Sequence, residues 1–160
     1  MKKIKVAIAG VGNCASALLQ GIEYYRGDNP EQAGLMHPSI GGWRPTDIEA
    51  VAAFDIDHRK VGHALEDALF AAPNCAQVFQ PVLPASGVTV QMGPVLDGVA
   101  DHMAAYGDDE AFRVSDSEAV DVAAALAAAG AEVLICYLPV GSEEAVFHYA
   151  RACLEAGVAM

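Results

Sequence analysis

The feature that most constrains the fold is a β-branched run that leads into a glycine-rich turn and then into an apolar stripe of helical period. Residues 3–25 read KIKVAIAGVGNCASALLQGIEYY. This order of strand, glycines and helix is the dinucleotide-binding fingerprint. The first glycine, Gly10, permits the tight turn after the strand, and the second, Gly12, lets a pyrophosphate approach the backbone. An ordinary glycine turn between a core strand and a core helix is the alternative explanation.

The first turn of the expected helix holds Asn13, Cys14 and Ala15. Small Ala15 allows the helix to pack closely on the strand. The unpaired N–H groups of this turn and the helix dipole together form an anion site that needs no basic side chain. The expected inward face of the helix comprises Ala15, Leu18, Leu19, Ile22 and Tyr25.

An acidic residue at the end of the second strand completes the fingerprint, because it accepts hydrogen bonds from the adenosine ribose. Asp55 follows the mostly apolar run 48–54 and fits this role. Its carboxylate would repel the 2′-phosphate of NADP, so the sequence favours NAD. Asp55 lies 43 residues after Gly12, and the excess is the Gly/Pro-rich loop 26–47. We expect this loop to be ordered over the nucleotide edge of the sheet, either as a surface excursion or in contact with a ligand or partner subunit.

Strands and helices continue to alternate after Asp55. A helix is expected over 58–71, with Val61, Leu65, Ala68 and Leu69 inward and with Arg59 and Lys60 as solvated surface charges. Residues 88–90 predict a short strand, residues 96–106 a further helix, and Asp108 to Glu110 a solvated acidic turn.

Ser115 and Glu118 form the S-x-x-E capping box, which predicts a helix from there to Gly130. An apolar strand over 132–138 follows, and then a helix that is capped by Ser142 and ends at Gly157. The expected inward residues of this last helix are Val146, Phe147, Ala150 and Leu154. Residues 158–160 predict a strand that has barely begun, so we expect the chain to stop inside a fold.

These elements predict an α/β fold with a doubly wound, mostly parallel sheet of the Rossmann type, truncated before its last strands. The whole chain, 1–160, is expected to be one partial nucleotide-binding domain. Ligands of such sheets bind at the carboxyl ends of the strands. The turn after the 132–138 strand is therefore a second candidate cofactor segment, unless it only makes a tight turn; it comprises Leu138, Pro139, Val140 and Gly141.

Composition excludes several classes of function. The formal charge of −12 opposes binding to nucleic acid or to an anionic membrane, and no apolar run approaches the ~20 residues of a membrane span. A cytoplasmic location is the expectation. The four cysteines, Cys14, Cys75, Cys136 and Cys153, lack paired spacing and are expected to be buried free thiols, with packing favoured over chemistry for Cys14. The scattered histidines predict no metal site.

Four segments carry a family resemblance: GVGNCASALLQG, DIEAVAAFDIDHRKVG, VQMGPVLDGVADHM and CYLPVGSEEA. Together they resemble the prokaryotic branch of inositol-3-phosphate synthase (myo-inositol-1-phosphate synthase), over essentially all 160 residues. The resemblance implies NAD-dependent isomerisation of glucose 6-phosphate by oxidation at C5, aldol ring closure and reduction, within inositol and phospholipid biosynthesis. It also implies a full-length parent that is a homo-oligomer, a tetramer.

The resemblance places Gly10, Gly12, Asn13 and Cys14 at the pyrophosphate, Asp55 at the ribose, and residues 138–141 along the nucleotide toward the nicotinamide. Such synthases are about twice as long, and their second half carries the lysine-rich catalytic site and the oligomerising sheet. We therefore expect no catalytic residue in this chain, whose only lysines are Lys2, Lys3, Lys5 and Lys60. A non-catalytic NAD-binding module, a truncated product, or a fragment of an ordinary NAD-dependent dehydrogenase are the alternatives.

Overall fold

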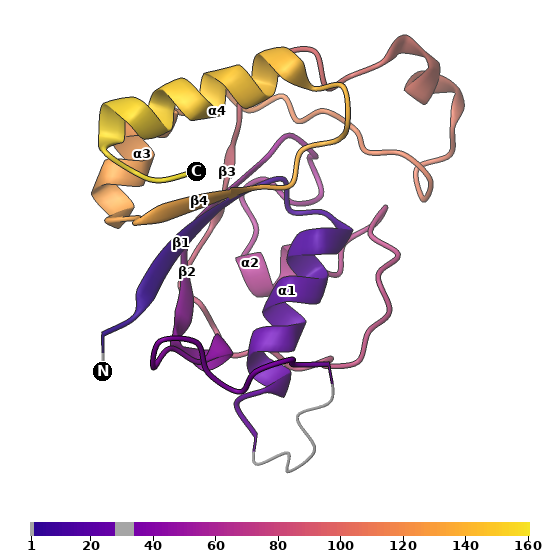
Figure 1. Cartoon of the computed structure of the whole chain (residues 1–160). Coiled ribbons are helices and arrows are strands. Elements are labelled where there is room, and N and C mark those ends of the chain that lie inside the picture. The colour runs from indigo at the N-terminus through magenta and orange to yellow at the C-terminus, as the bar shows by residue number, and fades with distance from the viewer. Residues whose placement is uncertain (1, 28–33) are drawn as a thin grey trace.

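A four-stranded parallel sheet organises the computed structural model, which describes residues 2–27 and 34–160 (Figure 1). The strands are β1 (Ile4–Ala9), β2 (Ile48–Asp55), β3 (Val90–Met92) and β4 (Val133–Cys136), in the order β3-β2-β1-β4. The chain first winds outward from β1 to β3 and then returns to place β4 on the other side of β1. The predicted doubly wound α/β fold of the Rossmann type is confirmed.

Helices cover both faces of this sheet (Figure 1). On one face lie α1 (Asn13–Tyr24) and the short α2 (Leu65–Ala68), and on the other lie α3 (Val122–Ala129) and α4 (Glu143–Ala156). Successive residues of β1 point to opposite layers: Ala7 and Ala9 join the core beneath α3 and α4, whereas Ile8 joins the core beneath α1 and α2. Burial on both faces explains why residues 6–9 of β1 are all apolar.

The last residues of the chain, where the sequence predicts the beginning of a strand, lie alongside β4. Ala159 forms a parallel bridge with Val133, its carbonyl accepts a hydrogen bond from Leu134 N–H at 2.7 Å, and its own N–H donates to Glu132 O at 3.0 Å. Gly157 ends α4 in the left-handed conformation (φ +69°), and Gly130 ends α3 in the same way (φ +62°).

The predicted helix over 58–71 is wrong outside Leu65–Ala68. Residues 58–63 form turns, and the helix is confined to Leu65–Ala68. Gly62 adopts φ +82°, which lies outside the helical region and interrupts the segment. Leu65, Ala68 and Leu69 are nevertheless buried, as expected.

Two further predicted helices differ from the structure, one in where it begins and the other in its length and type. The Ser115–Glu118 capping box does not start α3, because the side chain of Asp121 accepts the capping bond from Ala124 N–H at 3.0 Å. The backbone before it is engaged elsewhere, with Ser115 N–H donating to Ile56 O and Val120 N–H to Met92 O. In place of a helix over 96–106 there is only the 3₁₀ helix Asp101–Ala105.

The inward face of α4 also differs from the prediction. The buried residues are Ala145, Tyr149, Ala152 and Cys153, and the expected Val146, Phe147 and Leu154 are exposed. Small residues on the inner face allow α4 to lie close to α3 and the sheet, with Tyr149 packed against Phe54 at a ring-centroid distance of 5.8 Å. Hydrophobicity alone therefore indicated the wrong face.

The described part of loop 26–47 lies at the amino ends of the strands, opposite the edge at which it was expected. It connects the end of α1 to the start of β2 through the 3₁₀ helix Pro45–Asp47, and Lys3 Nζ donates to Thr46 O at 2.7 Å. Ile40 and Trp43 pair in a small antiparallel bridge. Residues 28–33 of this loop lie outside the described part of the chain.

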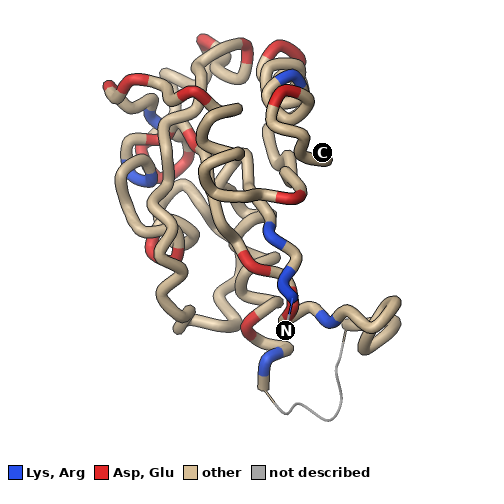
Figure 2. Tube along the Cα trace, turned by 90° about the vertical axis from the view of Figure 1, so that its left-hand side faces the viewer, with Lys and Arg blue, Asp and Glu red and all other residues tan. Residues whose placement is uncertain are grey.

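Acidic residues are spread along the whole trace, whereas basic residues are fewer (Figure 2). No helix within residues 2–27 and 34–160 is long and apolar enough to cross a membrane.

Candidate functional site

A cavity of about 730 Å³ lies at the carboxyl edge of the sheet, where the turns after β1 and β4 come together. This is the point at which the strand order reverses, and open α/β sheets bind ligands there. The volume is within the usual range for small-molecule sites. Eight of the ten predicted cofactor residues line the cavity: Gly10, Gly12, Asn13, Asp55, Leu138, Pro139, Val140 and Gly141.

The two glycines of the first turn have different roles. Gly10 adopts φ +91°, and a Cβ atom there would lie 2.8 Å from Tyr137 O, so Gly10 lets the two turns touch. A Cβ atom on Gly12 would meet nothing within 4 Å. The space at Gly12 is therefore open for the close approach of a ligand to the backbone.

The start of α1 faces this open space without a side-chain cap. Gly12 is the N-cap residue and makes no side-chain bond, so first-turn N–H groups have no partner within the helix. Asn13 instead fixes the neighbouring segment, because its Oδ1 accepts hydrogen bonds from Cys75 N–H at 2.7 Å and Ala76 N–H at 2.8 Å.

The other two predicted residues, Cys14 and Ala15, do not line the cavity. Cys14 is exposed in the first turn of α1, and Ala15 is fully buried beneath it against the sheet. All four cysteines are unpaired thiols, as predicted, but only Cys153 is buried, and Cys75, like Cys14, is exposed. Burial raises the pKa of the Cys153 thiol.

Asp55 closes β2 and holds the glycine turn. Its Oδ2 accepts a hydrogen bond from Val11 N–H at 2.7 Å, and its Oδ1 accepts from Ile56 N–H at 2.8 Å and Asp57 N–H at 2.9 Å. These bonds fix the carboxylate at the edge of the cavity. A carboxylate has about four acceptor positions, so one remains for a ligand hydroxyl.

Sequence reasoning missed a buried cation beside this carboxylate. Lys60, expected to be a solvated charge, is only 4% exposed and lines the cavity. Its Nζ donates to Val11 O at 2.8 Å and to Asn74 Oδ1 at 2.9 Å, and lies 4.0 Å from Asp55 Oδ2. Burial lowers the pKa of the Lys60 ammonium, and the nearby Asp55 carboxylate opposes this effect.

Arg59 was also expected at the surface and instead pairs with a buried carboxylate. Its Nε and Nη2 donate to Asp57 Oδ1 at 3.0 Å and Asp57 Oδ2 at 2.7 Å, and Asp57 is fully buried. Arg59 also donates to the carbonyls of Ala111 (2.8 Å) and Asp108. The hydrogen bond to Asp57 raises the pKa of Arg59. The expected acidic turn 108–110 is exposed and is tied to the site through this arginine.

The start of α4 borders the cavity on its other side. Ser142 occupies the predicted N-cap position, but its hydroxyl makes no capping bond and, among the described residues, is buried without a hydrogen-bond partner. Asp97 supplies the cap: its carboxylate accepts from Glu144 N–H at 2.7 Å and Ala145 N–H at 3.1 Å. The segment that carries Asp97, residues 94–112, lies along the cavity and contributes Leu96, Met103 and Phe112 to its lining.

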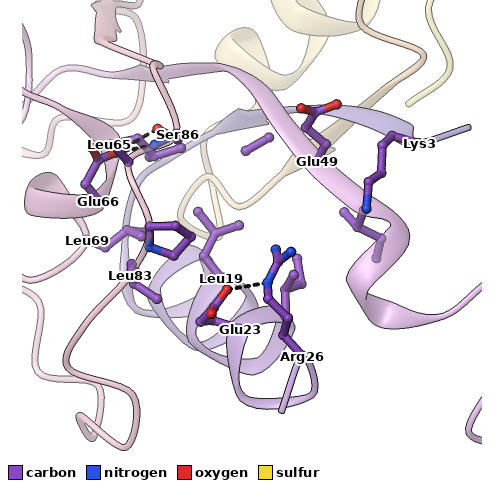
Figure 3. Close-up of a pocket in the computed structure, with 15 residues that line it drawn as sticks. Lys3, Leu19, Glu23, Arg26, Glu49, Leu65, Glu66, Leu69, Leu83 and Ser86 are labelled. Atoms are coloured by element: carbon purple, nitrogen blue, oxygen red, sulfur yellow. Dashed lines mark hydrogen bonds and ion pairs between the residues drawn. The ribbon is translucent and has the colours of Figure 1, made fainter. Parts of the chain in front are cut away.

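A second, smaller cavity of about 400 Å³ lies between α1, α2 and β2 (Figure 3). Leu19, Leu65 and Leu69 form its apolar wall. At its rim, Arg26 is bonded to Glu23 at 2.7 Å and Glu66 to Ser86 at 2.7 Å. None of the predicted site residues lines this cavity, so the larger cavity is the candidate site.

Comparison with known proteins connects this geometry to a family. The chain is 51% identical over 158 residues to an inositol-3-phosphate synthase of Corynebacterium glutamicum, and 47% identical over 159 residues to those of Mycolicibacterium smegmatis and Mycobacterium tuberculosis. The resemblance to the inositol-3-phosphate synthases is confirmed. Each match covers 98% of this chain but 42% of the relative, so the chain spans less than half the length of these synthases and is similar to an N-terminal portion of them.

Solved structures agree on the fold. The crystal structure of Ari2 matches 98% of the chain and 44% of its own length, with a TM-score of 0.78 and 34% identity. A myo-inositol-1-phosphate synthase-related protein from Thermotoga maritima matches with a TM-score of 0.62 and 18% identity, which shows the shared fold alone. No family model matches the sequence.

Proposed function

We propose that this chain is the NAD-binding part of an inositol-3-phosphate synthase, which converts D-glucose 6-phosphate to 1D-myo-inositol 3-phosphate. The observation that carries the proposal is the cavity at the reversal of strand order, which brings the glycine turn and the 138–141 turn together. The names of the relatives support the same reaction.

The residues of the cavity fit a dinucleotide. Open space at Gly12 and the uncapped start of α1 suit a pyrophosphate, because backbone N–H groups and the helix dipole attract an anion there. The remaining acceptor position of Asp55 suits a ribose hydroxyl, and its charge disfavours a 2′-phosphate. The unpartnered hydroxyl of Ser142 is a further polar group that a ligand in the cavity would satisfy.

When bound, NAD would supply a hydride acceptor and, once reduced, a hydride donor. The chain's own residues would bind the cofactor and orient it. Catalysis of the ring closure needs cations that stabilise developing oxyanions. Lys2 and Lys3 precede β1 and Lys5 lies within it, at the amino edge of the sheet, and Lys60 is engaged with the glycine turn. We therefore propose that the catalytic groups lie outside these 160 residues and that this chain alone does not turn over glucose 6-phosphate.

Calorimetric titration tests the cofactor assignment. We expect the chain to bind NAD more tightly than NADP, and Gly12→Ala to weaken NAD binding by about tenfold or more, because the new methyl group occupies the space that the pyrophosphate needs. Gly21→Ala is the matched control, since its Cβ atom also meets nothing within 4 Å but lies within α1, away from the cavity. Equal affinity of the wild type and Gly12→Ala for NAD, or no binding by the wild type, would contradict the proposal.

A further inference from the structure

We infer that Lys60 is a positioning residue of the cofactor cavity: its ammonium group holds the Val11 peptide, between the two glycines, in the orientation that presents the start of α1 to a diphosphate. The inference rests on the proposed function and assigns a role to a side chain that the fingerprint does not include.

The Val11 backbone is held on both sides. Its N–H donates to Asp55 Oδ2 at 2.7 Å, and its carbonyl accepts from Lys60 Nζ at 2.8 Å and from Asn74 Nδ2 at 3.1 Å. Asn74 is itself fixed, because it also donates to Leu69 O at 3.0 Å. A peptide between two glycines has few local restraints, so these bonds define its orientation.

Lys60 is the only lysine or arginine among the described residues that line the cavity. The acidic lining residues are Asp55, Asp97 and Glu110, which would all repel a diphosphate. A buried ammonium is costly unless it is paired, and here Val11 O, Asn74 Oδ1 and the Asp55 carboxylate surround it. The Lys60 ammonium thus fixes the glycine turn and offsets the negative charge of Asp55, the nearest of these carboxylates.

Removal of the ammonium has a specific consequence. Val11 O would keep only its bond from Asn74, and the Asp55 carboxylate would lose its nearby positive charge. Oδ1 of Asp55 would still be held by Ile56 N–H and Asp57 N–H, so the ribose-facing group would stay in place. The loss should therefore fall on binding of the diphosphate and not on binding of the nucleoside.

Lys60→Met tests this difference, with ADP and adenosine as probes in titrations followed by NMR, which measures weak dissociation constants. We expect the affinity for ADP to fall by about tenfold or more, in keeping with the loss of hydrogen bonds from a charged donor, and the affinity for adenosine to change by less than about twofold. Lys2→Met is the matched control. Its side chain is 77% exposed at the far edge of the sheet, and both affinities should be unchanged.

Each other outcome overturns the inference. Equal losses for ADP and adenosine would indicate a general structural role, and unchanged ADP affinity would show that the turn needs no cation. Failure of the wild type to bind ADP, adenosine and NAD would overturn the proposed function as well. Should Lys60→Met not fold, as judged by circular dichroism, Asn74→Ala replaces it; we expect a smaller loss, about threefold, again confined to ADP, and its absence would overturn the inference.

Discussion

At the scale of single residues, the charged side chains after β2 lie inside the molecule. Asp57 is paired with Arg59, two residues further along the chain. Arg59 and Lys60 also bond to groups distant in sequence: Arg59 to the carbonyls of Ala111 and Asp108, and Lys60 to that of Val11. Local sequence could place Gly10, Gly12 and Asp55 at the same edge of the sheet, because the glycine turn and the strand end are local features. It could not predict these partners, because the fold alone brings them together.

The pair of Asp57 and Arg59 leads to a prediction about stability. Arg59→Leu leaves the fully buried Asp57 carboxylate without its counter-charge, so we expect the free energy of unfolding to fall by about 3 kcal/mol. Urea denaturation followed by circular dichroism measures this change. Arg151→Leu is the control, on the exposed side of α4, and should change stability by less than about 0.5 kcal/mol. A similar small effect for both variants would contradict the assignment.

At the scale of elements, helix ends were predicted better than helix starts. Gly130 and Gly157 end α3 and α4 as expected, because a left-handed residue is a local property of glycine. The starts depend on competition for the same backbone donors. Asp121, and not Ser115, caps α3, and Asp97, and not Ser142, caps α4. Asp97 and Ser142 are 45 residues apart in the sequence.

The start of α4 leads to the next prediction. Asp97→Ala removes the acceptor of Glu144 N–H and Ala145 N–H, so we expect these two amides to exchange hydrogen about fivefold faster in exchange experiments. Ser142→Ala should leave them unchanged, because its hydroxyl makes no bond to the helix. The reverse pattern would show that Ser142 is the functional cap.

The same cap implies a dependence on pH. Desolvation raises the pKa of Asp97, but hydrogen bonds from the Glu144 and Ala145 backbones outweigh it and hold the pKa below its ordinary value. Because the folded pKa is depressed, this contribution to stability is present above the unfolded pKa of about 3.9 and is lost as the pH falls through the folded value. Acid should consequently reduce the protection of the Glu144 and Ala145 amides against exchange in the wild type, and it should reduce it less in Asp97→Ala.

At the scale of the whole molecule, the sequence predicts the fold class and the order of strands and helices along the chain. It does not predict which residues lie on the surface. Alternating apolar strands and helices suffice for the doubly wound sheet, since β1, β2 and β4 each lie within a predicted run. The course of segment 94–112 and the exposure of Phe147 and Leu154 depend on which surfaces meet, and local hydrophobicity does not encode this.

Net charge is a property of the whole molecule that leads to the last prediction. With 21 acidic and 9 basic residues, the folded chain carries a formal charge of −12, and its compact form is destabilised by self-repulsion. Raising NaCl from about 10 to 300 mM shortens the screening length from about 30 to 6 Å, so we expect the melting temperature at pH 7.5 to rise by about 3 °C or more. Differential scanning calorimetry measures this rise. The effect of salt on the melting temperature should shrink as the pH approaches the isoelectric point of about 4.5, where the repulsion vanishes. A melting temperature that falls with salt at pH 7.5 would contradict this prediction. It would show that attractive pairs such as Arg59 with Asp57 dominate the electrostatics of the fold.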